Sequence, residues 1–519
     1  MTTILWVDDE IEFLQSHIRY LEKRGYRVLT ATSGCAALEV LASNSVDLVL
    51  MDQMMVGMDG LETVDRMRES HHSLPVVMVT QSEEEELMDK AIGGTVVDYL
   101  TKPVNPSQIL LVIKRLLMGG RLRTQRAARE MADQTSMVLD MQSAKADWRE
   151  WMQIYRSLIE MDVASEGTLS DEMKSIQKAR MDDLAMGFSR LIENRFPEWL
   201  ATSGDDAPVM SHTFLDRMVK PRLGNTSELV LLVMDCMGYD QWLSMESSLT
   251  RWFSVETDFM MTILPSTTVY SRNSIFSGLL PRDMVRFYRK QWVEQYGTPG
   301  LNRFESEFLA DALGRLGWRS DAPLEFVKVT NRREGEVLLH SLSRHLQGGF
   351  LAIVVNYIDH LTHGRSELDL IRDLAPDVPS FRRLAESWFR SSFLKKLFQT
   401  LSARGATVLV TSDHGSVFTT RDTRIKGGRN IQGSLRYRYG SILNVDPKTA
   451  ITVKEPADWG LPDDMPSKTY AFARSDYFMM FQGVPREELF KFRNTFQHGG
   501  VSMQEMIVPN VVLTPKGAE

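Results

Sequence analysis

Short, fully apolar runs alternate with amphipathic stretches near both ends of this chain, and this alternation limits the folds that it can adopt. Within the first 118 residues the apolar runs occupy residues 4–7, 26–31, 46–51, 75–80 and 96–100. Runs this short and this apolar are typical of strands that are buried on both faces. Because helical patterns lie between them, we predict a doubly wound parallel sheet over residues 1–118.

A different pattern fills the middle of the chain. Residues 121–196 contain two glycines and no proline. Apolar residues recur there at the helical steps of three, four or seven, for example at Trp148, Met152, Tyr155 and Ile159. We therefore predict a helical bundle or linker over residues 119–207, with a boundary in the stretch from Pro197 to Pro208.

The strand–helix alternation returns in residues 208–519. Apolar runs at residues 229–234, 350–355 and 406–411 are each soon followed by acidic residues or histidine. This pattern predicts a second and larger α/β domain, with helices on both faces of a mainly parallel sheet.

The composition narrows the class of protein. With 43% hydrophobic and 25% charged residues, the 519-residue chain is typical of a globular protein with several domains. Its net charge of −8 provides no overall basic field for nucleic acid, so any anion binding must be local. The two cysteines, Cys35 and Cys236, form neither a disulfide framework nor a zinc ribbon. An acidic start, with no apolar run of about 20 residues, favours a cytoplasmic protein.

Acidic residues follow two strands of the first predicted sheet. Asp8 and Asp9 come directly after the first strand, and Asp52 comes directly after the third. Strand ends of a parallel sheet face one crevice, and crowded carboxylates there suit Mg²⁺. Thr80 and Lys102 add a hydroxyl and an ammonium at the same edge, so a carboxylate could accept a phosphoryl group. The alternative is that each polar residue only caps its strand.

These residues resemble the receiver domain of two-component response regulators. The matching motifs are VDDE (7–10), LMDQMMVGMDG (50–60), VT (79–80) and YLTKP (99–103). The resemblance implies phosphorylation of Asp52 by a sensor histidine kinase. It implies a magnesium site formed by Asp9, Asp52 and the Met54 carbonyl, with Asp8 in support. It also implies that Thr80 and Lys102 bind the phosphoryl oxygens, that Tyr99 reports the switch, and that the Lys102–Pro103 bond is cis.

Metal-binding residue types follow the strands of the larger domain. Asp235 ends the run at 229–234, and the pair Asp413 and His414 follows the run at 406–411. Asp359 and His363 are four residues apart, which places them on one face of a helical turn. His498 completes a set of six ligands, which suits two zinc ions that clamp a phosphoryl group. Alternatively, each of these residues forms an ordinary turn or cap.

The segment LPSTTVYSRNS (264–274) supplies hydroxyl groups. A threonine at a strand-to-helix turn would point at the metals, and zinc lowers the pKa of a bound hydroxyl as it does that of water. The candidates are Thr267 and Thr268. The helix start around Ser271 and Asn273 would offer backbone N–H groups to phosphate oxygens.

The same residues resemble the alkaline phosphatase superfamily, and within it the PglZ-type domain. The resemblance implies one zinc site formed by Asp235, Thr268, Asp413 and His414. It implies a second site formed by Asp359, His363 and His498. It favours Thr268 over Thr267, because the nucleophile of this superfamily lies three residues after a proline, here Pro265. No third metal site is evident in the sequence, which favours phosphodiester over phosphomonoester substrates.

A basic segment follows the Asp413–His414 pair. Its six cations are Arg421, Arg424, Lys426, Arg429, Arg436 and Arg438, and two tyrosines are interleaved with them. We predict that Arg424, Lys426, Arg429, Arg436 and Arg438 form a rim that binds a polyanion, by charge and by stacking on the aromatic rings. The alternative is a solvated, mobile loop.

The order of the three parts resembles PorX-type response regulators, whose family is tied to the type IX secretion system. The resemblance implies a two-zinc phosphodiesterase that acts on oligonucleotides or cyclic nucleotides, and a homodimer that depends on phosphorylation. Two alternatives remain open. The output domain could be a phosphomonoesterase, or a metal-bound docking module for a partner such as a sigma factor or a secretion component. A direct DNA-binding regulator fits least well, because no helix-turn-helix signature occurs.

Overall fold

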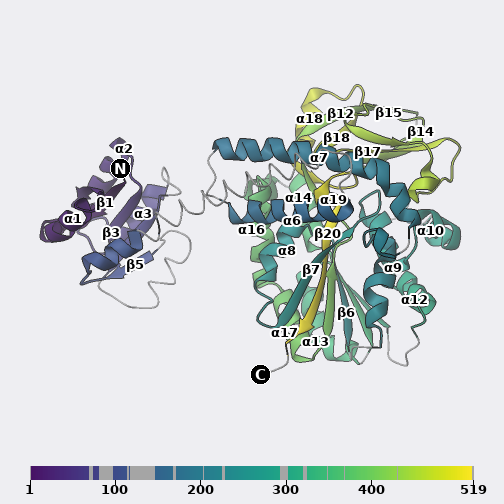
Figure 1. Ribbon diagram of the computed structural model, residues 1–519, viewed down its shortest axis with the longest axis horizontal. Helices are drawn as coiled ribbons and strands as arrows, with labels where there is room; N and C mark the ends of the chain where they lie inside the picture. The colour runs from purple at the N-terminus through teal and green to yellow at the C-terminus, as the bar shows by residue number, and fades with distance from the viewer. Residues whose placement is uncertain are drawn as a thin grey trace. The chain divides into compact units, whose positions relative to one another are not determined.

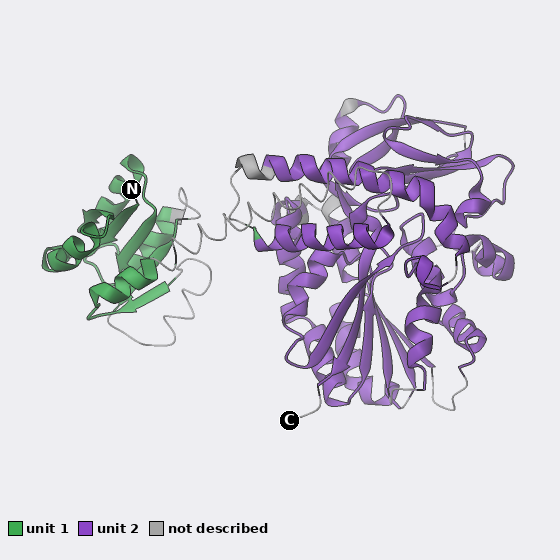
Figure 2. Cartoon of the chain, viewed as in Figure 1, with its two compact units in different colours: residues 1–136, 165–170 green, residues 137–164, 171–519 purple. Residues whose placement is uncertain are grey.

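The fold is described from a computed structural model of the chain. The residues described are 2–68, 74–80, 98–113, 116, 147–166, 171–202, 204–224, 228–292, 302–318, 324–347, 349–367, 369–428 and 430–516. The chain divides into two compact units, one formed by residues 1–136 with 165–170 and the other by residues 137–164 with 171–519 (Figure 2).

The smaller unit contains a five-stranded parallel sheet. Its strands are β1 (Thr3–Val7), β2 (Arg27–Ala31), β3 (Leu48–Asp52), β4 (Val76–Thr80) and β5 (Asp98–Thr101). Its helical elements are η1 (Ile11–Leu14), α1 (Gln15–Glu22), α2 (Gly34–Ser43) and α3 (Gly60–Arg68). The strand order is β2-β1-β3-β4-β5, with every pairing parallel, so the predicted doubly wound sheet is confirmed.

The two faces of this sheet explain why its strands are so apolar. In β1, Ile4 and Trp6 pack into one hydrophobic cluster, while Leu5 and Val7 pack into another. Successive side chains of a strand point to opposite faces. A strand with a core on both faces therefore has no polar position, which is the pattern seen in the sequence.

Two long helices that precede the larger sheet pack against its domain. They are α6 (Trp148–Ala164) and α7 (Asp171–Ala201), which belong to the larger unit (Figure 2). Their residues Trp151, Phe188 and Trp199 belong to the same hydrophobic core as the large sheet. The helix α7 continues through Pro197 and ends at Ala201, inside the stretch from Pro197 to Pro208 in which a boundary was predicted. The buried rings of Phe196 and Trp199 hold the last turn against the core.

A six-stranded sheet forms the centre of the larger unit (Figure 1). Its strands are β6 (Leu229–Met234), β7 (Phe253–Met261), β8 (Leu324–Val329), β9 (Phe350–Val355), β10 (Thr407–Thr411) and β20 (Ile507–Pro515). The order is β7-β20-β10-β6-β9-β8. The four strands from β10 to β8 are parallel, and β20 lies antiparallel between β10 and β7.

Helices cover this sheet, with α8 and α16 on one side and α9 and α12 on the other (Figure 1). The helices are α8 (Tyr239–Glu246), α9 (Asn273–Ser277), α10 (Pro281–Phe287), α12 (Glu305–Arg315), α13 (Arg332–His345), α14 (Tyr357–Glu367), α15 (Asp369–Leu374), α16 (Val378–Ser391), α17 (Phe393–Ala403), α18 (Arg486–Phe492) and α19 (Met503–Met506). The short turns are η2 (Gly204–Asp206), η3 (Ser211–Thr213), η4 (Leu215–Val219), η5 (Lys220–Arg222), η6 (Thr268–Arg272) and η7 (Pro456–Trp459). No helix in the described ranges is long and apolar enough to cross a membrane.

Three small sheets lie between β10 and β20 in the sequence. They are β11 (Val417–Thr419) with β19 (Thr495–Gln497); β15 (Asn444–Val445), β12 (Arg421–Lys426) and β18 (Tyr477–Phe481); and β13 (Gln432–Gly433), β14 (Tyr437–Ser441), β17 (Lys468–Ala473) and β16 (Ala450–Val453). Much of the basic segment therefore lies in β12, β13 and β14 rather than in a loop.

Candidate phosphorylation site and metal centre

Three carboxylates meet at one edge of the small sheet, where β1 and β3 end. Oxygens of Asp8, Asp9 and Asp52 lie within 4.8 Å of one another. The Lys102 ammonium lies 2.8 Å from Asp52 Oδ2 and 3.0 Å from Asp8 Oδ2. Asp8 and Asp52 are buried, whereas Asp9 is exposed. The sequence therefore folds so that the predicted acids and lysine form one cluster.

The electrostatics of this cluster suit a bound cation. Burial raises the pKa of the Asp52 carboxyl, although Lys102 and the Met54 backbone N–H oppose the shift. A divalent ion would remove that penalty, and three carboxylates are the oxygen ligands that Mg²⁺ prefers. The Met54 carbonyl stays a predicted ligand.

The predicted switch residues lie on the neighbouring strands. Thr80 is buried at the end of β4, and Tyr99 lies in β5. The Tyr99 hydroxyl is buried without a hydrogen-bond partner among the described residues, and burial raises its pKa. The Lys102–Pro103 bond is cis, as expected.

Four polar side chains, which we call the Thr268 group, meet where strands of the large sheet end. Asp235 directly follows β6, Asp413 and His414 follow β10, and Thr268 begins η6. His414 Nε2 lies 3.1 Å from Thr268 Oγ1 and 3.7 Å from both Asp235 Oδ1 and Asp413 Oδ2. Thr268 Oγ1 is 3.5 Å from Asp235 Oδ1.

The backbone determines which atom His414 presents to this group. His414 Nδ1 lies 3.1 Å from the Gly415 carbonyl, which can only accept a hydrogen bond. Nδ1 therefore carries the proton, and Nε2 of the neutral ring offers its lone pair to the group. Gly415 must be glycine, because a Cβ there would overlap the Gln504 carbonyl oxygen.

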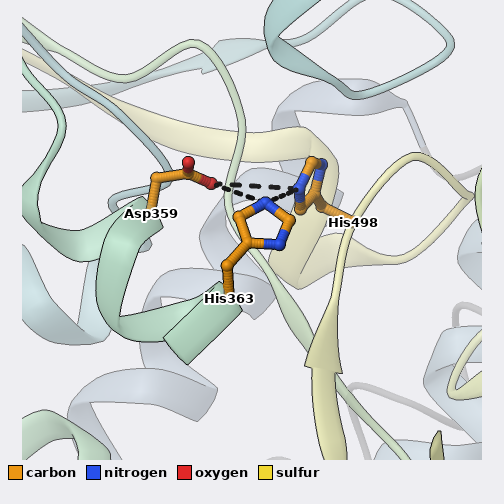
Figure 3. Close-up of side chains that lie close together, drawn as sticks. All are labelled: Asp359, His363 and His498. Atoms are coloured by element: carbon orange, nitrogen blue, oxygen red, sulfur yellow. Dashed lines mark hydrogen bonds and ion pairs between the residues drawn. The ribbon is translucent and has the colours of Figure 1, made fainter. Parts of the chain in front are cut away.

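Asp359, His363 and His498 form a second cluster, which we call the histidine group (Figure 3). Asp359 and His363 lie one turn apart on α14, and His498 follows β19. Asp359 Oδ1 is 3.3 Å from His363 Nε2 and 3.9 Å from His498 Nε2. The two Nε2 atoms are 3.5 Å apart.

The two groups adjoin through their histidines. The rings of His414 and His498 are stacked, with centroids 4.2 Å apart and planes 14° apart. All six predicted ligands and the threonine therefore converge, although they come from segments more than 250 residues apart.

The donor atoms fit zinc ions. Ligands about 2.0–2.2 Å from a tetrahedral zinc lie about 3.3–3.6 Å from one another. The separations within the two groups, from 3.1 to 3.9 Å, bracket this range. Asp413 Oδ2 is also buried without a hydrogen-bond partner in the described structure, as expected of an atom that a cation would bind.

Charge states at the centre also suit metal binding. Burial raises the pKa of Asp413 to about 6 and that of Asp235 well above its usual value. Burial lowers the pKa of His498 to about 3, so its ring is neutral at pH 7. Burial would raise the pKa of Asp359, but the hydrogen bond with His363 and the nearby histidines lower it well below its usual value.

Sequence reasoning missed the basic residue behind these ligands. Arg272 is buried, with Nη1 2.5 Å from Asp235 Oδ2 and Nε 2.6 Å from Glu305 Oε1. Its spacing of four residues from Thr268 was the available signal. Glu305 is itself fully buried and pairs with Lys328 at 2.7 Å. Residues 273–304 separate η6 from Glu305, so no local pattern connects the two side chains.

Two residues of the predicted substrate-binding set lie in the interior. Arg436 is fully buried, and its guanidinium contacts Glu505 at 2.5 and 3.1 Å. Asn273 is also buried; its side chain donates to Val269 O and Asn302 Oδ1, and its backbone N–H to Tyr270 O. Neither residue can reach a substrate without breaking these interior contacts.

The other predicted rim residues differ in what they contact. Arg424 donates to the carbonyls of Phe481 and Val484, and Arg438 lies 4.8 Å above the Phe481 ring. Lys426 is exposed at the end of β12. Arg429 lies outside the described residues. A substrate role for these four residues stays a prediction.

Three family descriptions match the chain in succession. A response regulator receiver domain matches residues 4–114, and a PorX response regulator linker domain matches residues 121–200. The description "BREX system PglZ alkaline phosphatase-like domain" matches residues 214–513, which is more than half of the chain.

Individual relatives resemble the receiver part. The heme response regulator HssR of Staphylococcus epidermidis is 35% identical over 117 residues, covering 22% of this chain and 52% of its own. The transcriptional regulatory protein YvrH of Bacillus subtilis is 39% identical over 115 residues, covering 22% of this chain and 47% of its own. The chain thus spans about half the length of these curated relatives.

Among solved structures, the chemotaxis protein CheY4 of Vibrio cholerae is 30% identical, covering 22% of this chain and 98% of its own, with a TM-score of 0.22. The three family matches together span most of the chain, whereas each of these relatives matches the receiver part alone. This chain belongs to the PglZ alkaline phosphatase-like family and is a PorX-type response regulator, with a receiver, a PorX linker and a PglZ domain.

Proposed function

We propose that the output domain is a two-zinc phosphodiesterase that acts on oligonucleotides or cyclic nucleotides, and that phosphorylation of Asp52 regulates it. One observation carries the proposal. The Thr268 hydroxyl lies 3.1 Å from His414 Nε2, and the His414 ring is stacked on His498 of the histidine group. A hydroxyl beside two adjoining metal-ligand sets is the arrangement that phosphoryl transfer to a nucleophile requires.

The ligands divide between two ions. Asp235, Thr268, Asp413 and His414 would hold one zinc, and Asp359, His363 and His498 the other. Bound zinc supplies positive charge that lowers the pKa of a hydroxyl and offsets charge on phosphate oxygens. Thr268 Oγ1, after losing its proton, forms a bond to phosphorus as the bond to one ester oxygen breaks, and that oxygen takes up a proton to become an alcohol. Water hydrolyses the resulting threonine phosphodiester, which restores the hydroxyl and releases a phosphate monoester.

Charge favours a diester over a monoester. The carboxylates at the centre are Asp235, Glu305, Asp359 and Asp413, and the ion-paired cations are Arg272 and Lys328. With neutral histidines and two divalent ions, the centre carries two net positive charges. A deprotonated Thr268 and a singly charged diester neutralise them, whereas a monoester dianion leaves an excess negative charge. In the described structure no further lysine or arginine forms an ion pair with a ligand here.

The test is hydrolysis by the zinc-loaded full chain of bis(4-nitrophenyl) phosphate and of 4-nitrophenyl phosphate. We expect the diester to be the better substrate. Thr268→Ala should lower kcat at least about a thousandfold, as loss of a nucleophile does. Thr267→Ala is the matched control, because it removes the same side-chain atoms at the adjacent residue and should lower kcat far less than Thr268→Ala does. A preference for the monoester would favour a phosphomonoesterase, and zinc binding without turnover would favour the docking function.

The receiver gives the proposed regulation. Asp52 would accept a phosphoryl group from a sensor histidine kinase, with Mg²⁺ held by Asp9, Asp52 and the Met54 carbonyl and with Asp8 in support. The added charge would move Thr80 and Tyr99, and the altered face would pair two copies of the chain. We also propose a role in the control of type IX secretion, by resemblance to PorX-type regulators. After treatment with a phosphodonor, the wild type should form dimers and change its rate of diester cleavage, whereas Asp52→Ala should do neither. If the treated wild type has the same oligomeric state and cleavage rate as Asp52→Ala, this regulation is refuted.

A further inference from the structure

Arg272 is a buried cation that contacts the carboxylates of the Thr268 group. Its residue surface is 3% exposed. Nη1 lies 2.5 Å from Asp235 Oδ2 and 3.8 Å from Asp413 Oδ2, and Nε lies 2.6 Å from Glu305 Oε1. The guanidinium therefore touches one proposed zinc ligand closely and a second at longer range.

The two oxygens of Asp235 have different partners. Oδ2 accepts the hydrogen bond from Arg272, whereas Oδ1 lies 3.5 Å from Thr268 Oγ1 and 3.7 Å from His414 Nε2. The guanidinium thus fixes the rotation of this carboxylate. It leaves Oδ1 alone turned toward the Thr268 group, so that Asp235 would bind an ion through one oxygen.

Arg272 is itself held rigidly. Glu305 accepts from Arg272 through Oε1 and pairs with Lys328 at 2.7 Å through Oε2. The planar fork of arginine can bridge Asp235 and Glu305 at once, which a lysine ammonium on a flexible stem does less well. Arg272 is also the last residue of η6, and Thr268 is the first. One short element therefore carries both the proposed nucleophile and the side chain that orients Asp235.

We propose that Arg272 is a positioning residue that acts through Asp235 and sets the zinc affinity of the Thr268 group. The inference rests on the proposed function, because it assumes that this group binds zinc. Ligand-orienting residues of this kind typically change metal affinity tenfold to a hundredfold.

The experiment titrates zinc into the metal-free full chain by calorimetry, which reads binding without catalysis. We expect two sites in the wild type. Arg272→Gln should weaken zinc binding about tenfold or more at one site and less than about twofold at the other. His363→Ala removes a ligand of the histidine group, so the site that it weakens is the histidine group and the other site is the Thr268 group. Arg272→Lys should recover part of the lost affinity, because it keeps the charge beside Asp235.

A second buried arginine provides the matched control. Arg382 is also 3% exposed and pairs with Asp162 and Asp240, which are not proposed zinc ligands. Arg382→Gln should leave both zinc affinities within about twofold of the wild type, even where it lowers stability.

Several results would overturn the inference. Unchanged zinc affinity in a folded Arg272→Gln protein would show that Asp235 needs no orientation. Tighter zinc binding would mean that the guanidinium only opposes the charge of the ion. If both Arg272 variants fail to fold while Arg382→Gln folds, the role of Arg272 is structural. A wild type that binds no zinc would instead refute the proposed function itself.

Discussion

Replacing Arg436 by methionine tests whether this arginine is structural, as the fold indicates, or part of a substrate-binding rim. Arg436 and Glu505 are both fully buried, and they share two hydrogen bonds of 3.1 and 2.5 Å. Glu505 Oε1 also accepts the Gly500 N–H at 2.8 Å, close to His498. Arg436→Met therefore leaves a buried carboxylate without its cation.

The expected cost follows from that burial. Breaking a buried pair by removing one partner costs about 3–5 kcal/mol of unfolding free energy, because an uncompensated charge stays in the interior. Replacing both partners, as in Arg436→Met with Glu505→Leu, should cost less than the sum of the two single changes, because no isolated charge remains. Arg438→Met, two residues further along in β14 and over the Phe481 ring, should cost less than about 1 kcal/mol.

Urea unfolding of the full chain, followed by tryptophan fluorescence, measures these differences. The fitted transition is the one that reports the larger unit, which contains the buried Trp199 and Trp242. An Arg436→Met protein within 1 kcal/mol of the wild type would refute the structural assignment, above all if diester cleavage fell sharply at unchanged stability.

Three further predictions concern other parts of the chain. Burial lowers the pKa of His212 to about 4, so between about pH 4 and 6.5 the unfolded chain binds more protons than the folded chain. The unfolding free energy should therefore fall by up to about 3 kcal/mol as the pH drops through this window. Urea titrations at several pH values measure this dependence, and His212→Asn should make the unfolding free energy depend less on pH. Gly415→Ala should destabilise the larger unit and abolish diester cleavage, because its Cβ would overlap the Gln504 carbonyl; normal melting and activity would contradict the close approach. Lys102→Met should greatly slow phosphorylation by acetyl phosphate, measured on Phos-tag gels, since it removes the ammonium 2.8 Å from Asp52; an unchanged rate would show that this contact is dispensable.

Local patterns were enough to predict the strands that are buried on both faces. Residues 4–7 of β1 and all residues of β6 are apolar because each strand has a hydrophobic layer on either side. The positions of Asp235 and Asp413 follow from this, because parallel strands end at one edge of the sheet. The spacing of Asp359 and His363 places them on one helical turn for the same kind of local reason.

Features that depend on long-range packing were not predictable in the same way. The strand β7 was missed because it alternates buried and exposed positions for most of its length, and its pairing with β20 joins residues about 250 apart. A proline usually ends or kinks a helix, but the buried rings of Phe196 and Trp199 on either side of Pro197 keep α7 intact as far as Ala201. Arg436 and Arg438 look alike in the sequence, and only the position of Glu505 shows which of them is interior.

The central claim is that two metal ions gather around the Thr268 hydroxyl, and counting zinc in the purified full chain tests it most directly. Inductively coupled plasma mass spectrometry should find two zinc ions per chain in the wild type. It should find about one in His363→Ala, which lacks a ligand of only the histidine group, and that variant should no longer cleave diesters. A wild type that carries no zinc after equilibration with excess zinc and gel filtration would contradict the account.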